Sequence, residues 1–570
     1  MRPFCSSPGT FLILILGLIL RASVGVYASV LPQSIIYAEQ QTQLLPVVDG
    51  ESQDVVDGSI KTPPRLRALL NALDLMQDTY FDVFSGTWPS AIDWTAAVLG
   101  THVSATLSSL VSSLKGSNLS CSDRLAWENI IAKYFAQISI FYFGENAFGL
   151  RHQAYDDMLW VVLGWLESIK FMKMYSLGYW EANSASKIAG RWHGMQFSPT
   201  AAHRARIFYD LASHGWDTTL CEGGMNWNPA LTPYKNAITN ELYISASISM
   251  YLYFPGDNNT SPYFVDNPGD NDVGTPHDPV YLENAIKAYK WLQQSKMQSQ
   301  DGLYQDGFHI SGWRRYANGT IDHGSRHCDV LNSMVYTYNQ GVLLTASRGL
   351  WMATGARSYL DEGHVLVDSV IKATGWPSQG IMWQGLGRGG ILEEFCDHSG
   401  CCSQDGQTFK GIFFNHLAEF CRPLWGYEED FVSAMIQAGL DQDVYHYHKT
   451  RCAAYGAWIA RNADAASVTK DTTGLFGMWW GREYPDTEPI DDIAPQTKLP
   501  LRAVDHMNNG AASWDGIWGH YARFDGRSVS DDNYHDVNDR GRGRSVETQS
   551  GGLAVLRADW QWRSLLAEYY

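Results

Sequence analysis

The sequence has little positive charge and few charged residues of either sign. Its 42 Lys and Arg residues are outnumbered by 60 Asp and Glu residues, so the 570-residue chain carries a formal net charge of −18. Polyanionic partners need a basic face, and this balance therefore argues against nucleic acid. Charged residues make up only 18% of the chain and hydrophobic residues 45%, which excludes a disordered protein and permits a large buried core.

Long hydrophobic runs are also scarce. The run at Phe11–Leu20 is only ten residues long and is closed by Arg21. Ten helical residues rise about 15 Å, roughly half of a bilayer core. We expect residues 1–28 to be a cleaved secretory signal, with an uncleaved anchor as the alternative. No later segment is expected to span a membrane, and residues 565–570 lack the hydrophobic tail of a GPI signal. The mature protein is therefore expected to be secreted, and association with the cell wall stays open.

The cysteine count agrees with export. Nine cysteines are present, and loss of Cys5 with the signal leaves an even number, which predicts disulfides. Cys396, Cys401 and Cys402 lie close enough in sequence to close a small loop. No CxxC pair with spaced histidines and no HExxH motif occurs, so neither a metal site nor a cofactor is predicted. Glycosylation sequons begin at Asn118, Asn258, Asn259 and Asn318.

Alternating β patterning is scarce, so the fold class is predicted to be all-α. Residues 29–64 have no sustained period and are interpreted as a flexible lead, and residues 65–570 as one catalytic domain. Within it, residues 339–352 and 358–372 predict a helical hairpin around Gly355. The segment at about 483–545 is rich in Pro, Asp, Asn and Gly and is interpreted as a long surface insertion.

Two kinds of helix can be distinguished. Met158–Leu166 is apolar around its whole circumference, which predicts burial on all sides. Tyr281–Gln294 is amphipathic and is expected to face solvent on one side. Inner helices surrounded by outer helices would form a helical toroid. Aromatic residues reach 13% of the chain, and because flat sugar faces stack on such rings, a glycan-handling protein is a candidate.

Two adjacent carboxylates, Asp156 and Asp157, directly precede the fully apolar helix. Acids at a helix start can simply cap free N–H groups. This helix is predicted to be buried, however, and an idle charged pair is costly to bury. Neighbouring side chains at a helix start can place carboxyl groups about 5 Å apart, the separation that retaining glycosidases use. A like-charged neighbour also raises one pKa and keeps that acid protonated as a proton donor.

These residues bring a known family into view. The run Tyr155–Trp160 resembles the aspartate pair of glycoside hydrolase family 76, the endo-α-1,6-mannanases and their fungal cell-wall relatives. Five further blocks follow in the order of that family, and together they cover roughly residues 67 to 480 and the last helix. These blocks are Gly223–Asn228, Tyr234–Leu242, Tyr336–Gly341, Phe409–Ile412 and Glu547–Ser550.

The resemblance implies an (α/α)6 barrel with a cleft at one mouth and a retaining mechanism. Carried over by position, Asp156 is the expected nucleophile and Asp157 the general acid/base. The long insertion before Glu547 and the lack of a GPI signal depart from the fungal relatives.

Other residues of these blocks are candidates for binding substrate. Trp227 could stack on a mannose ring or pack in the core, and Asn226 could bind sugar hydroxyls or serve as a turn residue. Tyr338, Asn339 and Gln340 open an apolar helix, where we favour contact with substrate over capping. Phe409 and Lys410 lie in a block that matches the family, but Phe409 could simply pack in the core and Lys410 could simply be solvated.

The leading interpretation is a secreted retaining glycosidase that cleaves α-1,6-mannosidic bonds within mannan through a covalent glycosyl-enzyme intermediate. Its expected partner is α-1,6-mannan or another mannose-containing wall glycan. The alternative is a cell-wall transglycosidase that uses the same aspartate pair to transfer glycans, because both outcomes need the same two carboxylates. A non-catalytic glycan-binding protein is a third interpretation.

Overall fold

The computed structural model describes residues 62–114, 120–180, 192–259, 274–377, 380, 382–437, 439, 443–481, 499–508 and 536–567. The predicted signal, most of the predicted lead, the sequon at Asn118 and much of the predicted insertion lie outside these residues.

Six helices of the described chain form a closed inner ring. Each packs against the next in chain order, and the last packs back on the first. They are α2 (Asp93–Leu114), α5 (Tyr155–Tyr175), α8 (Ala237–Tyr253), α10 (Thr337–Thr354), α12 (Gln404–Cys421) and α16 (Val546–Ala567).

Six outer helices each cover one member of this ring. Helices α1 (Pro64–Tyr80) and α15 (Gly456–Val468) both cover α16. Helix α3 (Cys121–Gly144) covers α2, and α7 (Ser198–Ser213) covers α5. Helix α9 (Pro279–Gln294) covers α8, and α11 (Ser358–Ala373) covers α10. The protein is therefore an (α/α)6 barrel, as predicted.

Burial separates the inner helices from the outer ones as the sequence indicated. Within Met158–Leu166, every residue except Gly164 is buried, so the ring of side chains around α5 is enclosed. On α9 the buried residues are confined to one face, which includes Tyr281, Ala285 and Leu292. The predicted hairpin is also confirmed, because α10 and α11 are joined at Gly355, whose φ of 73° suits a residue without a Cβ.

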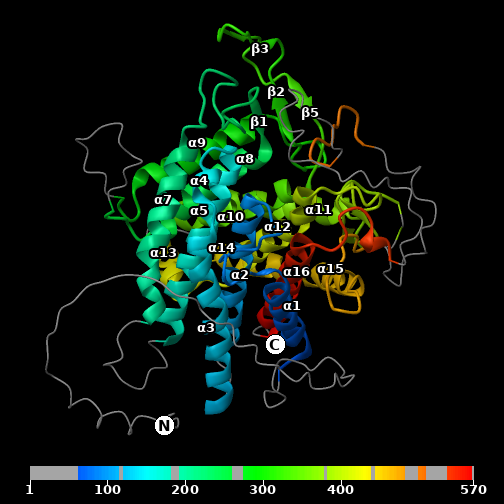
Figure 1. Ribbon diagram of the computed structural model, residues 1–570. Coiled ribbons are helices and arrows are strands. Elements are labelled where there is room, and N and C mark those ends of the chain that lie inside the picture. The colour runs from blue at the N-terminus through cyan, green and yellow to red at the C-terminus, as the bar shows by residue number, and fades with distance from the viewer. Residues whose placement is uncertain are drawn as a thin grey trace, which may run out of the picture.

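Inner and outer helices alternate along the chain, so all six inner helices begin at the same end of the barrel. We call this end the mouth. The strand β1 (Tyr234–Asn236) leads directly into α8 and marks the mouth in Figure 1, where β2 (Gly307–His309) and β5 (Val330–Asn332) lie beside it. These three form an antiparallel sheet in the order β1-β2-β5.

Further short elements decorate the barrel. A hairpin pairs β3 (Trp313–Arg315) with β4 (Ile321–His323), and a second pairs β6 (Gly387–Arg388) with β7 (Ile391–Leu392). The sequence analysis did not anticipate these strands, because two or three residues are too few to show an alternating pattern. Additional helical segments are α4 (Ala147–Leu150), η1 (Ser176–Trp180), η2 (His193–Phe197), α13 (Gly426–Gln437), α14 (Asp443–Ala453) and η5 (Val537–Asp539).

The described parts of the predicted insertion pack on the barrel. Tyr336 Oη donates a hydrogen bond to Asp505 Oδ1 at 2.9 Å, and Ser333 Oγ donates one to the Leu501 carbonyl at 2.7 Å. In the basic stretch that ends the insertion, Arg544 forms ion pairs with acids such as Asp536. That arginine is therefore held by local carboxylates.

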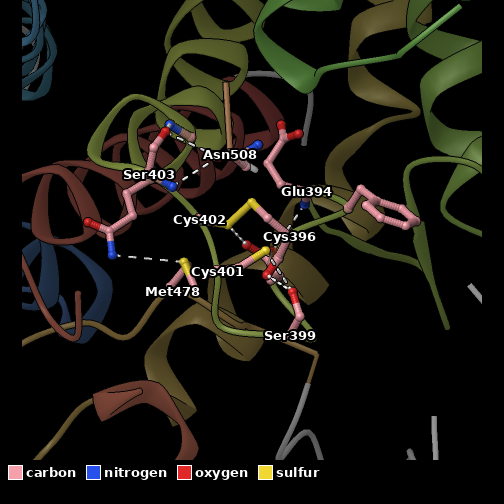
Figure 2. The surroundings of a disulfide bond; sticks show 12 residues. Glu394, Cys396, Ser399, Cys401, Cys402, Ser403, Met478 and Asn508 are labelled. Atoms are coloured by element: carbon pink, nitrogen blue, oxygen red, sulfur yellow. Dashed lines mark hydrogen bonds between the residues drawn. A yellow bond between two sulfur atoms is a disulfide. The ribbon is translucent and has the colours of Figure 1, made fainter. Parts of the chain in front are cut away.

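Three disulfides form among the described residues: Cys221–Cys328, Cys396–Cys402 and Cys421–Cys452. The predicted small loop is confirmed by the second of these. Complete pairing is wrong, because Cys401 is a free thiol beside that disulfide (Figure 2). Ser399 Oγ donates to its sulfur at 2.9 Å, and the sulfur of Cys402, its neighbour in sequence, already has a partner. The side chain of Cys121 is outside the description.

One helix of the described chain is long and apolar enough to cross a membrane, contrary to the expectation that none follows the signal. It is α2, with 22 residues, and 83% of its most apolar window is buried inside the protein. Inner barrel helices are apolar on every side because they are enclosed by other helices. Helix α2 therefore resembles a membrane-spanning helix in length and composition although it is buried in the protein.

Candidate active site

The aspartate pair lies at the start of α5, at the mouth of the barrel. Asp156 is 9% exposed and Asp157 is half-buried. Asp157 Oδ2 accepts a hydrogen bond from the Ala154 N–H at 3.2 Å, and Asp156 Oδ1 accepts one from the Asp157 N–H at 3.1 Å. The pair therefore caps its helix, as acids at a helix start do. Within the described residues, the hydrogen bond to the Asp157 carboxyl is made on Oδ2, so Oδ1 stays available for chemistry.

The indole of Trp227 holds the first aspartate. Trp227 Nε1 donates a hydrogen bond to Asp156 Oδ2 at 3.0 Å. The backbone joins the same two segments, because the Tyr155 N–H donates to the Trp227 carbonyl and the Trp227 N–H donates to the Tyr234 carbonyl, each at 2.8 Å. The ring is half-buried, and its polar edge positions Asp156. Stacking of a sugar on its face stays a prediction.

The loop that carries this indole is strained and firmly held. Residues 221–224 all have positive φ, although the first two, a cysteine and a glutamate at 57°, are types that rarely adopt it. Lys235 Nζ donates to the Gly224 carbonyl at 2.6 Å, and the Met225 N–H donates to Asn240 Oδ1 at 2.7 Å. Lys235 and Asn240 belong to the block that follows the Gly-rich loop in sequence, and the structure gives them the task of fixing that loop.

Burial controls the charge of the pair. It raises the pKa of Asp156 to about 7, against the opposing effect of hydrogen bonds that include the one from Trp227. Burial and then the charge of Asp156 raise the pKa of Asp157 well above its usual range. Hydrogen bonds favour the ionised form of Asp156, whereas the charge of Asp156 favours the protonated form of Asp157. One acid can act as a base or nucleophile while its neighbour remains a proton donor.

Tyr338 reaches the same site from α10. Its ring stacks on Phe409 of α12 with 3.9 Å between centroids and 10° between planes. Burial raises the pKa of Tyr338 well above its usual range, with contributions from the charges of Asp156 and Asp405. The phenol therefore lies within the electrostatic field of acids on two different helices. Phe409 provides the support for this ring.

The two amide side chains after Tyr338, those of Asn339 and Gln340, differ in their hydrogen bonds. Gln340 is fully buried; its Nε2 donates to the carbonyls of Tyr304 and Tyr336, and its Oε1 accepts from the Tyr304 N–H at 2.8 Å. Its hydrogen bonds thus fasten the segment before β2 to α10. Asn339 is also fully buried, but neither its Nδ2 nor its Oδ1 has a hydrogen-bond partner among the described residues. Substrate contact by either amide stays a prediction.

Asn226 lies beside Trp227 in the Gly-rich loop. Its N–H donates to the Gly215 carbonyl at 2.8 Å, and its Nδ2 donates to Asp217 Oδ2 at 3.3 Å. Its Oδ1 is buried and has no partner among the described residues. The side chain thus stabilises the loop, and its contact with sugar hydroxyls stays a prediction.

The block around Lys410 has a structural role in the described chain. Lys410 Nζ forms a buried ion pair with Asp397. Glu394, three residues before that aspartate, accepts a hydrogen bond on Oε1 from the Thr337 N–H at 2.8 Å, and so caps α10 from outside the helix. Lys410 therefore helps to position the segment that fixes the start of α10, where Tyr338 is located.

Two residues at the mouth were missed by the sequence analysis. Trp94, on the first turn of α2, stacks on Trp160 of α5 with 5.7 Å between centroids. Its Nε1 donates to Asp405 Oδ1 on α12 at 2.9 Å. A signal was present, because α2, α5, α12 and α16 all carry an acid in the first turn. An acid that recurs at the start of buried helices marks one shared end of a barrel.

Two groups of potential metal ligands occur among the described residues, away from the aspartate pair. They are His364 with His448 and Cys452, and Asp397 with Cys396 and Cys402. Every cysteine in these groups belongs to a disulfide, so none offers the thiolate that binds metal.

Comparison with known proteins identifies one family. The model of glycosyl hydrolase family 76 matches residues 275–465. This range contains Tyr338 and Asp405, whereas the aspartate pair precedes it. Two of the resembling blocks, Tyr336–Gly341 and Phe409–Ile412, lie within this range, and the match confirms the resemblance there.

Curated relatives carry the same kind of name. Mannan endo-1,6-alpha-mannosidase DCW1 of Saccharomyces cerevisiae is 24% identical over 225 residues, which are 38% of this chain and 39% of that protein. DCW1 of Candida glabrata is 20% identical over 228 residues, which are 38% of this chain and 40% of that protein. The chain thus spans about two fifths of the length of the curated relatives that it matches.

Solved structures also align with the barrel. A family 76 mannosidase from Bacteroides thetaiotaomicron has a TM-score of 0.48 and 15% identity, covering 88% of this chain and 99% of that chain. Dfg5 from Chaetomium thermophilum in complex with glucosamine has a TM-score of 0.47 and 14% identity, covering 87% and 90% respectively.

Proposed function

Residues 275–465 belong to glycosyl hydrolase family 76, and from this premise we propose that the chain is a secreted retaining glycosidase that cleaves α-1,6-mannosidic bonds within mannan. The observation that carries the proposal is the buried aspartate pair, in which Trp227 holds Asp156 and Asp157 keeps a free oxygen. The names of the curated relatives support mannan as the substrate. The three disulfides agree with an oxidising compartment outside the cytosol.

The first half of the reaction uses the two aspartates in different protonation states. The Asp156 carboxylate attacks the anomeric carbon of the mannose unit, and a covalent glycosyl–enzyme ester forms as the glycosidic C–O bond breaks. Asp157 gives its proton through Oδ1 to the departing glycosidic oxygen, so the leaving chain departs as a neutral alcohol. The charge of Asp156 raises the pKa of Asp157, which supports an ionised Asp156 beside a protonated Asp157.

The second half reverses the roles. Asp157, now ionised, takes a proton from an incoming hydroxyl group, whose oxygen attacks the anomeric carbon and releases Asp156. When the hydroxyl belongs to water, the enzyme hydrolyses mannan. When it belongs to another glycan, the enzyme transfers the mannosyl chain, which is the alternative activity that the same residues permit.

The test is product analysis on linear α-1,6-mannan oligosaccharides, with and without an added acceptor glycan. Wild type is compared with Asp156→Asn and with Asp361→Asn, which removes an exposed carboxylate that pairs with Arg357 on α11. Shorter mannosides that retain the anomeric configuration at first release, from wild type and Asp361→Asn alone, are the expected result. Inverted products would overturn the retaining mechanism.

Other outcomes separate the remaining interpretations. Longer or acceptor-linked products would move the assignment from hydrolysis to transglycosylation. Binding of the oligosaccharide without any product from wild type would establish a non-catalytic glycan-binding protein and reduce the aspartate pair to a helix cap.

A further inference from the structure

A third carboxylate faces the aspartate pair across the mouth. Asp405 is the second residue of α12, and α12 lies opposite α5 in the ring of six, because α8 and α10 separate the two on one side and α16 and α2 on the other. Trp94 of α2 connects the two sides, since its ring stacks on Trp160 of α5 while its Nε1 donates to Asp405 Oδ1 at 2.9 Å. The acid is thus held in a defined position by a rigid indole.

Capping does not account for this acid. Asp405 stands in the first turn of its helix, where a carboxylate can serve the free N–H groups. That task is already performed by Ser403, whose Oγ accepts a hydrogen bond from the Gly406 N–H at 3.1 Å. Among the described residues, Trp94 is the side chain that donates a hydrogen bond to Asp405, and it does so to Oδ1.

The second oxygen of this acid remains open. Asp405 is half-buried, and its Oδ2 has no hydrogen-bond partner within the part of the chain that the structure describes. The neighbouring acids differ in position. Glu547 on α16 accepts hydrogen bonds on Oε1 from Thr95 and Gln404 while its buried Oε2 has no partner among the described residues, and Asp93 on α2 accepts one on Oδ2 from Gln153. Neither α16 nor α2 lies opposite α5 in the ring, whereas α12 does. Asp405 is therefore the acid opposite the pair that combines a fixed position with an available acceptor.

Tyr338 places this acceptor in the same site as the pair. Its ring lies on Phe409, one turn along α12 from Asp405. Burial, then the charge of Asp306, and then those of Asp156 and Asp405 raise the pKa of its phenol. A sugar ring whose anomeric carbon meets Asp156 would thus extend towards α12, with Tyr338 at its side.

We propose that Asp405 is a substrate-binding residue whose Oδ2 accepts a hydrogen bond from a ring hydroxyl of the sugar unit that Asp156 attacks. A carboxylate is a strong acceptor for neutral hydroxyl groups, and hydrogen bonds to charged groups stabilise more than neutral ones. The bond fixes the rotation of the sugar about the line from α5 to α12. The proposal rests on the proposed function, because it needs a sugar at the aspartate pair.

Binding can be measured without turnover. In the Asp156→Asn background, calorimetric titration with α-1,6-mannotriose is repeated after Asp405→Ala, Asp405→Asn or Ser403→Ala. We expect Asp405→Ala to weaken binding about 10- to 100-fold, the range of a hydrogen bond to a charged group, and Asp405→Asn to weaken it less. Ser403→Ala removes the cap of the same helix and is expected to lower the melting temperature while leaving the affinity within about twofold.

Analogues identify the hydroxyl and exclude a merely structural role. The same titrations use mannotriose analogues that each lack one ring hydroxyl. For one analogue, we expect the affinity for the Asp156→Asn variant to fall by the same factor as on Asp405→Ala. The Asp156→Asn/Asp405→Ala double variant should bind that analogue as tightly as it binds mannotriose. Equal losses for every analogue in both backgrounds would overturn the proposal, since a residue that only shapes α12 has no preferred hydroxyl.

The two levels of the argument fail in different ways. If wild type does not turn over α-1,6-mannan, the proposed function falls and this proposal with it. If wild type is active and Asp405→Ala binds mannotriose as tightly as its parent, only the assignment of Asp405 is overturned.

Discussion

The aspartate pair at the mouth and an ion-pair cluster at the far end of the barrel bury charge in opposite ways. At the mouth, Asp156 and Asp157 stand side by side without a basic partner, and burial raises the pKa of both. At the far end, Arg422 donates to Glu419 at 2.7 Å and forms a second ion pair with Glu428. These basic partners hold the pKa of both glutamates below the usual range, against the effect of burial.

The difference supports the proposal that the chemistry takes place at the mouth. Removing a carboxylate from water is costly everywhere in the barrel, and an ion pair compensates for that cost. A carboxylate locked to a buried arginine would make a poor nucleophile and could not hold a proton near neutral pH. Helix α5 carries an unpaired acid at one end and an ion pair at the other. Asp156 lies at its start, and Lys170, which pairs with Glu419 at 2.8 Å, lies fourteen residues or about 21 Å further along.

The largest expected effect comes from removing the proton donor at the mouth. Asp157→Asn should lower kcat on mannan oligosaccharides by about a hundredfold to ten-thousandfold, the contribution of a positioned general acid. An aryl mannoside whose phenol leaves without a proton should lose far less in its first step. Burst kinetics on both substrates measure the difference, and equal losses on both would remove Asp157 from the acid role.

The far end should respond in stability and not in chemistry. Glu428→Gln leaves the Arg422 charge without one of its buried partners and should lower the free energy of unfolding by about 3–5 kcal/mol. The exposed pair of Arg357 and Asp361 on α11 gives the matched control, because breaking it should cost less than about 1 kcal/mol. Urea unfolding gives both values. The comparison breaks if the folded Glu428→Gln enzyme loses more than about half of its kcat.

Disulfides extend the same contrast. Cys221–Cys328 anchors the strained loop that carries Trp227, whereas Cys421–Cys452 fastens the far end of α12. Replacing either pair by serines should destabilise the protein by about 2–5 kcal/mol. Only the Cys221→Ser/Cys328→Ser variant should also lower kcat, by about tenfold, because Asp156 then loses its fixed donor. An unchanged kcat in the Cys221→Ser/Cys328→Ser variant would show that the loop is held by its hydrogen bonds alone, and an equal fall in the Cys421→Ser/Cys452→Ser variant would show that kcat follows overall stability.

Local patterns in the sequence carried much of this description. An all-round apolar stretch such as Met158–Leu166 can only be buried, and an amphipathic one such as Tyr281–Gln294 can only face solvent on one side. Their alternation was enough to predict a toroid. The aspartate pair stood out because an acid pair is unusual directly before a buried helix.

The remaining features depend on ring closure, which no local pattern encodes. The bond from Trp227 to Asp156 joins residues 71 apart, and the bond from Trp94 to Asp405 joins residues 311 apart. Gln340 was assigned to substrate contact because a buried amide needs partners, and those partners proved to be backbone groups of the Tyr304 segment. Cys401 could not be recognised as a free thiol, because Cys401 and Cys402 both lie at a suitable distance in sequence from Cys396 and either could pair with it.

The smallest effect is a pH dependence of stability with opposite signs at the two ends. Burial raises the pKa of Asp156 to about 7, so between about pH 4 and pH 7 the folded protein binds more protons than the unfolded chain, and this group costs stability as the pH rises. Asp156→Asn removes that cost. Its stability should match wild type near pH 4 and exceed it by roughly 2 to 4 kcal/mol at pH 8, since one pKa unit corresponds to about 1.4 kcal/mol.

Glu428 provides the mirror image. Its pKa lies below the usual range, so its contribution is complete above about pH 4.5 and is lost as the pH falls further. The deficit of Glu428→Gln should therefore be constant from pH 5 to pH 8 and shrink in acid. Urea unfolding of wild type and both variants at pH 4, 6 and 8 distinguishes the two signs. A stability gain for Asp156→Asn that does not grow with pH would mean that Asp156 is not held in a desolvated, unpaired state, and the contrast between the two ends would not hold.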